Sequence, residues 1–158
     1  MPRMPGTKWR LLRNAAAGVV VMFACASQAR AQEPIAGYVK IVSGAASVVR
    51  AGQEQPLVLG FGVLPGDSLK TGADGRVGVT LKDDTRLSLG PNTEIAVASF
   101  AYAPTDGQLG FVMRVVRGAV AYISGRIAKL SPESIKIETP TSILGVRGTH
   151  LLIAAGQP

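Results

Sequence analysis

The fold of this chain is decided by the stretch Glu138-Thr139-Pro140-Thr141-Ser142-Ile143-Leu144-Gly145-Val146-Arg147-Gly148-Thr149-His150. Two glycines bracket an arginine there, between two apolar segments at residues 143–144 and 151–153. Glycine at such positions indicates a backbone that needs a positive φ or a close approach, and the Arg147 guanidinium offers five donors that can hold neighbouring carbonyls. We therefore predict a tight turn between two short strands, with Arg147 at its centre.

Outward from this stretch, apolar residues alternate in short segments, which is the signature of strands. Turn residues (glycine, proline or aspartate) recur every 7 to 15 residues and leave no room for a helix of ordinary length. The pattern predicts an all-β single domain of short strands. The expected strands lie at residues 37–42, 45–50, 77–81, 87–89, 95–100, 111–116, 119–124, 135–137 and 151–153.

Two turns have a clear chemistry. Pro65-Gly66 supplies the fixed φ and the positive φ of a type II turn, and the carboxylate of Asp67 can cap it. Asp83 and Asp84 separate two alternating segments, so we expect both acids at a solvated turn tip.

A faint internal duplication is also present. Residues 42–45 (Val-Ser-Gly-Ala) are echoed by residues 116–119 (Val-Arg-Gly-Ala), and residues 67–70 by residues 133–136. Such self-similarity favours two related sheet units that are stacked or coiled, in a sandwich- or solenoid-like arrangement. Chance matches in a glycine- and valine-rich chain would look the same, so both interpretations stay open.

The first 31 residues have the pattern of a secretory signal peptide. They contain five basic residues and no acid, then an apolar run of twelve residues and the small-x-small site Ala29-Arg30-Ala31. A run of that length is too short to span a bilayer, which needs about 20 residues. We predict cleavage after Ala31, which would leave a domain at residues 32–158 with its core at about 37–153. No later segment is expected to span a membrane.

The net charge of +7 comes mostly from this leader. Without it, the chain carries 12 basic and 10 acidic residues, a net charge of +2, and it has no run of lysine or arginine. Such a balance argues against a nucleic-acid partner. Cys25 is the only cysteine, and it lies in the leader behind the bulky Phe23. A lipid anchor at Cys25 is therefore not expected.

The residues offer little for catalysis or for metal binding. His150 is the only histidine, and no nucleophile elbow, phosphate loop or metal-ligand pair accompanies it. We expect no enzyme activity, no cofactor and no metal. Arg147 has two possible roles: to hold carbonyls of its own turn, which we favour, or to present a fork to a carboxylate, a phosphate or an acidic glycan.

The order and spacing of several motifs resemble the FecR-like domain. These motifs are residues 44–45, 48–49, 64–71, 76–81, 87–93, 116–120, 137–140 and 144–149, and the resemblance extends from about Gly37 to Ile153. The resemblance implies an all-β module on the outer face of the cytoplasmic membrane, which in well-known members receives a signal from an outer-membrane receptor and controls a sigma factor. We see no sigma-binding segment and no membrane-spanning helix, so direct sigma-factor control is not expected here.

Together these observations predict a non-catalytic periplasmic β module that binds a protein or envelope partner, in signalling or regulation as FecR-like domains do. The alternative is a structural or carbohydrate-binding protein of the cell envelope. The candidate motif residues, structural or partner-binding, are Gly66, Asp67, Gly145, Arg147, Gly148 and Thr149.

Overall fold

A computed structural model describes residues 34–156 of the chain. The predicted signal peptide, with its cleavage site after Ala31, lies outside the described residues. Within them the chain forms twelve strands, and the one α-helix is α1 (Arg126–Leu130), next to two 3-10 turns, η1 (Pro104–Asp106) and η2 (Pro132–Ser134). The all-β prediction is confirmed.

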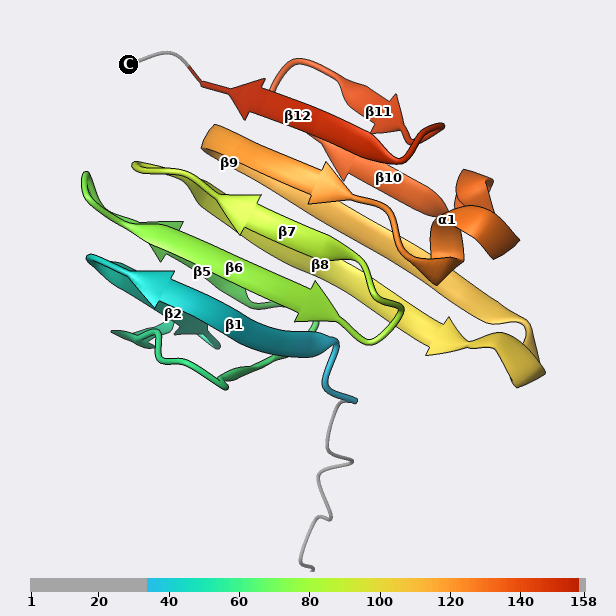
Figure 1. Cartoon of the computed structure of the whole chain (residues 1–158), viewed down its shortest axis with the longest axis horizontal. Coiled ribbons are helices and arrows are strands. Elements are labelled where there is room, and N and C mark those ends of the chain that lie inside the picture. The colour runs from blue at the N-terminus through green and yellow to red at the C-terminus, as the bar shows by residue number, and fades with distance from the viewer. Residues whose placement is uncertain (1–33, 157–158) are drawn as a thin grey trace, which may run out of the picture. The chain divides into compact units, whose positions relative to one another are not determined.

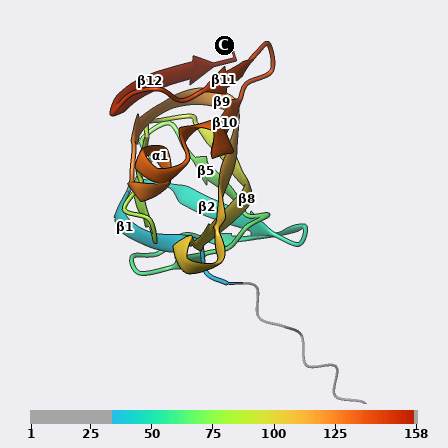
Figure 2. The same cartoon turned by 90° about the vertical axis from the view of Figure 1, so that its right-hand side faces the viewer.

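The strands form one sheet that curls, so that two wings face each other (Figures 1 and 2). Strand β9 (Gln108–Ile123) belongs to both wings. The first wing adds β1 (Gly37–Ser43), β4 (Gly62–Val63), β6 (Arg76–Leu81), β7 (Arg86–Leu89) and β12 (His150–Ala155). The second wing adds β2 (Ala46–Arg50), β3 (Gln53–Pro56), β5 (Ser68–Thr71), β8 (Glu94–Ala103), β10 (Ile135–Glu138) and β11 (Ile143–Gly145).

Strand β9 turns the corner between the wings at Gly118. Its first part pairs with β8 and β10, and its last part pairs with β7 and β12. Gly118 has a φ of +86°, and a Cβ there would lie 2.4 Å from Oγ1 of Thr93. The equivalent glycine of the internal duplication, Gly44, carries the chain from β1 to β2 at a φ of +67°. Both echoed segments therefore make a corner, but the facing units are the wings and not the two halves of the sequence.

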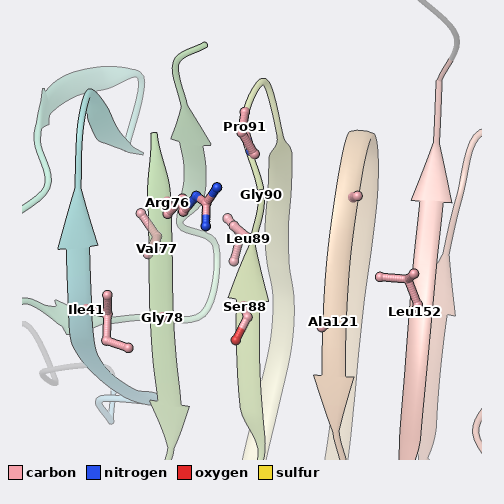
Figure 3. Close-up of a pocket in the computed structure, with 11 residues that line it drawn as sticks. Ile41, Arg76, Val77, Gly78, Ser88, Leu89, Gly90, Pro91, Ala121 and Leu152 are labelled. Carbon is pink, nitrogen blue, oxygen red and sulfur yellow. The ribbon is translucent and has the colours of Figure 1, made fainter. Parts of the chain in front are cut away.

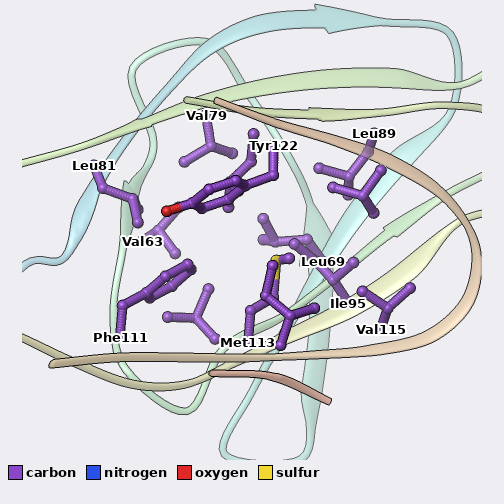
Figure 4. Packing of buried hydrophobic residues seen from close by; sticks show 14 of the residues in the cluster. Val63, Leu69, Val79, Leu81, Leu89, Ile95, Phe111, Met113, Val115 and Tyr122 are labelled. Atoms are coloured by element: carbon purple, nitrogen blue, oxygen red, sulfur yellow. The ribbon is translucent and has the colours of Figure 1, made fainter. Parts of the chain in front are cut away.

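The core lies between the wings, because the strands alternate inward apolar and outward polar residues. Figure 4 shows its centre, where Tyr122 and Phe111 stack with ring centroids 6.4 Å apart, on one side of Leu69 and Met113. Each fully buried side chain of this size stabilises the fold by about 1.5–3 kcal/mol relative to an exposed one. Helix α1 lies at one end of the curl (Figure 2), where its Ile127 is fully buried.

The predicted turn at Pro65-Gly66 is confirmed. Gly66 has a φ of +91°, the Asp67 amide donates to the Leu64 carbonyl at 3.2 Å, and the Leu64 amide donates to Oδ2 of Asp67 at 2.8 Å. This brings the chain into β5 at a fixed angle.

The prediction for the two acids of the β6–β7 turn was half wrong. Asp84 is exposed, but Asp83 is only 1% exposed. The Thr85 hydroxyl donates to Asp83 at 2.8 Å, and the Ile127 amide donates to it at 3.3 Å. Asp83 therefore connects this turn to the start of α1. The donors satisfy its carboxylate, as a buried polar group requires.

Candidate functional site

The carboxylate of Asp67 is buried and hydrogen-bonded within the domain. It is 1% exposed and accepts two hydrogen bonds from Arg50, whose guanidinium also donates to the Gly62 carbonyl at 2.7 Å. Arg50 lies over the ring of Phe61, 4.9 Å from its centroid. The hydrogen bond to Asp67 is the main cause that raises the pKa of Arg50. The donors to this carboxylate are the Arg50 guanidinium and the Leu64 amide, both of the same domain.

The second group of candidate residues forms the loop between β11 and β12. Val146 fixes this loop, because its side chain is 1% exposed within the hydrophobic cluster. At the loop's end the Ser124 amide donates to the Thr149 carbonyl at 3.0 Å. Gly148 has a φ of +153°, whereas Gly145 has neither a positive φ nor a close neighbour. The expected conformational need for glycine therefore holds at Gly148 and was wrong at Gly145.

Arg147 makes none of the contacts that its expected structural role requires. Its side chain is exposed, and within residues 34–156 no carbonyl or carboxylate accepts a hydrogen bond from it. The favoured role, a guanidinium that pins the carbonyls of its own turn, is not supported by these contacts. The loop is held instead by the apolar side chain of Val146 and the main chain of Thr149.

Arg147 lines a hollow of about 620 Å³ between the β10–β11 hairpin and the start of β12, which we call the Arg147 hollow. Lys136 lines the same hollow, because it pairs in register with Gly145 across the hairpin. The apolar part of the lining comes from Ile135, Ile143, Val146 and Leu151, and the rest from Pro132, Glu133, Glu138 and Gly145.

The charged side chains that line the Arg147 hollow differ in whether they already have a partner in the domain. Glu138 accepts hydrogen bonds from Arg114 at 2.8 and 3.0 Å. Glu133 accepts one from the Ser131 hydroxyl, which is the main cause that lowers the pKa of Glu133. Neither Lys136 nor Arg147 forms an ion pair with a described residue. Glu133 keeps its negative charge, because a hydroxyl donor does not neutralise it. The hollow therefore combines two cations that have no ion-pair partner, one such carboxylate and an apolar lining, and its cations suit an anionic group attached to an apolar body.

His150 lies in a separate hollow of about 490 Å³. Ser124 and Asp84 line it too, but no hydrogen bond joins the histidine to either of them in the described part of the chain. Asp84 pairs instead with Arg126 at 3.1 Å. Among residues 34–156 no group of three or more metal-binding side chains is found.

Sequence reasoning missed Arg50 and Lys136. Arg50 looked like the end of a strand, and nothing near it in the sequence points to a carboxylate 17 positions away. Lys136 carried a usable signal, because it alternates between the buried Ile135 and Ile137 and so had to face outward. Only the pairing of β10 with β11 brings it to Arg147.

The FecR protein family matches residues 67–158, which is more than half of the chain. The chain belongs to the FecR family. The resemblance was expected from about Gly37, and residues 37–66 lie outside the match although strands β1 to β4 belong to the same sheet.

A comparison with curated proteins found no match. A solved structure described as "Cell surface anchoring domain" is 27% identical, with a TM-score of 0.37, and the match covers 39% of this chain and 82% of that one. In the described part of this FecR-family chain no helix has the length and the apolar character needed to cross a bilayer.

Proposed function

We propose that this chain is a non-catalytic periplasmic module that binds a protein or another envelope component through the Arg147 hollow. Membership of the FecR family suggests a regulatory role. The observation that carries the proposal is the placement of Arg147, which is exposed at a hollow and bonded to no described residue. An arginine that stabilised its own turn would show the opposite arrangement.

The chemistry of the hollow indicates the kind of group that it takes. Arg147 and Lys136 supply donors for a carboxylate, while Glu133 and Glu138 already accept hydrogen bonds from within the domain. Ile143 is 70% exposed at the rim, so an apolar side chain beside the carboxylate would gain contact area. We infer that the partner offers an acidic residue flanked by apolar ones.

The alternative, a structural or carbohydrate-binding envelope protein, receives no specific support. Sugar sites lean on exposed aromatic faces, and the large aromatics Phe111 and Tyr122 are buried. Tyr38 is 39% exposed, and Lys40 lies over its ring at 5.7 Å.

The proposal is tested by site-specific photo-crosslinking in the intact envelope. A photoreactive residue at Lys136 should capture a discrete partner. The same residue at Lys40, an exposed lysine on β1, is the matched control and should capture none. Equal labelling from both positions, or none from Lys136, would contradict binding at the hollow.

A further inference from the structure

Strand β12 is an edge strand with one unprotected side. Among the described residues it pairs with β9 alone. Exposed edges are usually blunted by charge, proline or short length. The edge strand β3 carries Glu54 and Pro56, and the edges β4 and β11 have two and three residues. Strand β12 has six residues, His-Leu-Leu-Ile-Ala-Ala, without a lysine, an acid or a proline.

The direction of its free hydrogen-bonding groups follows from the ladder with β9. The Ser124 amide donates to the Thr149 carbonyl at 3.0 Å, so Thr149 faces β9 with its backbone groups. Bonded and non-bonded pairs alternate along an antiparallel ladder. His150, Leu152 and Ala154 therefore direct their N–H and C=O groups to the free side.

The same three residues face outward from the first wing, and Leu152 is 80% exposed. Leu152 closes a row that runs in register across five strands, with Ile41, Gly78, Ser88 and Ala121 as its other members. The row forms part of the lining of an apolar trough of about 380 Å³ (Figure 3). Ile41, at the far wall, lies on β1, which pairs with β6 but meets β4 only at Gly37 and Tyr38. The free part of that edge carries an irregularity between Val39 and Ile41 and the charge of Lys40, two features that protect an edge. Beyond Leu152 the described sheet stops.

We propose that two copies of this chain join through β12 in an antiparallel pair, with Leu152 opposite Leu152 of the second copy. Inward residues must oppose inward residues, because a shift of one position would exchange the faces. Pairing at Leu152 meets this condition and sets His150 opposite Ala154 of the second copy. These are the residues whose backbone groups are free, so the pair completes three bonded positions around a two-fold axis.

The charges favour a second copy as the occupant. No charged side chain lies on β12, so self-pairing opposes no like charges. Arg117 on β9 lies beside Gly156, just after the end of β12, and pairs with Glu94 at 3.4 Å. The next outward cation is Arg86 on β7, which β9 separates from β12. At about 4.8 Å between strands, the two Arg86 side chains would lie roughly 25 Å apart, beyond the screening length of about 8–10 Å.

Leu151 is the one residue of β12 that also lines the Arg147 hollow. The interface is small, so we expect a concentration-dependent dimer. Sedimentation of the exported protein should show the mass rising toward that of a dimer between 1 and several hundred µM, on the order of the concentrations that weak interfaces require. The variant Leu152→Lys sets two ammonium groups opposite each other and should remain a monomer. Ile41→Lys makes the same change at the other wall of the trough, where the irregularity of β1 and Lys40 already protect the edge, and should dimerise as the wild type does.

A covalent test fixes the register. Cα atoms of a bonded antiparallel pair lie about 5.5 Å apart, within the range of a disulfide. In a Cys25→Ser background, Leu152→Cys should therefore form a crosslinked dimer on mild oxidation, and Ile41→Cys should not. A wild type that stays monomeric throughout, a Leu152→Lys variant that dimerises normally, or equal crosslinking at the two cysteines would overturn the proposal. Capture of β12 by a strand of another protein, without self-association, would overturn it as well.

Discussion

Arg50 holds the carboxylate of Asp67 with two hydrogen bonds, one of 2.8 Å from Nε to Oδ1 and one of 2.6 Å from Nη2 to Oδ2. The pair joins the end of β2 to the turn before β5. Asp67 is 1% exposed, whereas the Arg50 side chain is 34% exposed. The pair therefore links two parts of the second wing through a buried carboxylate and a guanidinium that is still in contact with water.

Asp67→Ala should lower the free energy of unfolding by about 3 kcal/mol, because it leaves the Arg50 guanidinium and the Leu64 amide without their acceptor. Urea unfolding measures this loss. Asp106→Ala, at an exposed acid of η1, is the control and should stay within about 0.5 kcal/mol of the wild type. Equal stability of the two variants would show that the pair contributes nothing.

Gly118→Ala and Gly60→Ala separate backbone strain from steric contact. The two glycines have φ values of +86° and +81°, but a Cβ at Gly118 would lie 2.4 Å from Thr93, and at Gly60 it would meet nothing within 4 Å. Gly60→Ala should cost about 1–2 kcal/mol for the positive φ alone. Gly118→Ala should cost about 1–3 kcal/mol more, because the β9 corner must shift. Similar thermal unfolding of both variants would contradict a required close approach at Gly118.

Tyr122 should make the fold sensitive to alkaline pH. Burial is the main cause that raises the pKa of Tyr122 to about 12. An unfolded tyrosine loses its proton near pH 10, so between pH 10 and 12 the unfolded state binds fewer protons than the folded state. Stability should fall by about 2–3 kcal/mol across this window and then level off.

Tyr122→Phe should flatten that part of the pH profile. Its stability at pH 7 should equal or exceed that of the wild type, because the Tyr122 hydroxyl has no hydrogen-bond partner among the described residues. Unfolding curves recorded from pH 9 to 12.5 provide the comparison. An unchanged alkaline slope in Tyr122→Phe would show that another group is responsible.

Alternation and turn chemistry sufficed to predict the all-β class and the turn at Pro65-Gly66, because both depend on neighbours in the sequence. The order of the strands in the sheet could not be predicted from these local patterns. Strand β10 runs parallel to β9, which local patterns cannot indicate. The prediction that Asp83 lies at a solvated tip was wrong, because one of its hydrogen-bond donors, the Ile127 amide, is 44 positions away and leaves no local signal.

The candidate site shows the same division. The motif around Arg147 is evident in the sequence, but the outward direction of its side chain depends on Val146 being buried in the core. Lys136 reaches the same hollow through the hairpin register with Gly145. Neither relationship can be derived from spacing alone.

Arg147→Ala should leave the free energy of unfolding within about 0.5 kcal/mol of the wild type, since the guanidinium is exposed and bonded to no described residue. A fall in the free energy of unfolding of about 1.5–3 kcal/mol would contradict this and indicate that Arg147 holds neighbouring carbonyls. Urea unfolding of the purified protein gives the value.

The role of Arg147 is tested most directly by the crosslinking yield from position 136 in the Arg147→Ala background. We expect the captured partner to disappear while the variant remains folded. Arg147→Lys should recover only part of the yield, because an ammonium cannot reproduce the planar fork. A yield in Arg147→Ala equal to that of the wild type would contradict binding of the partner by this arginine.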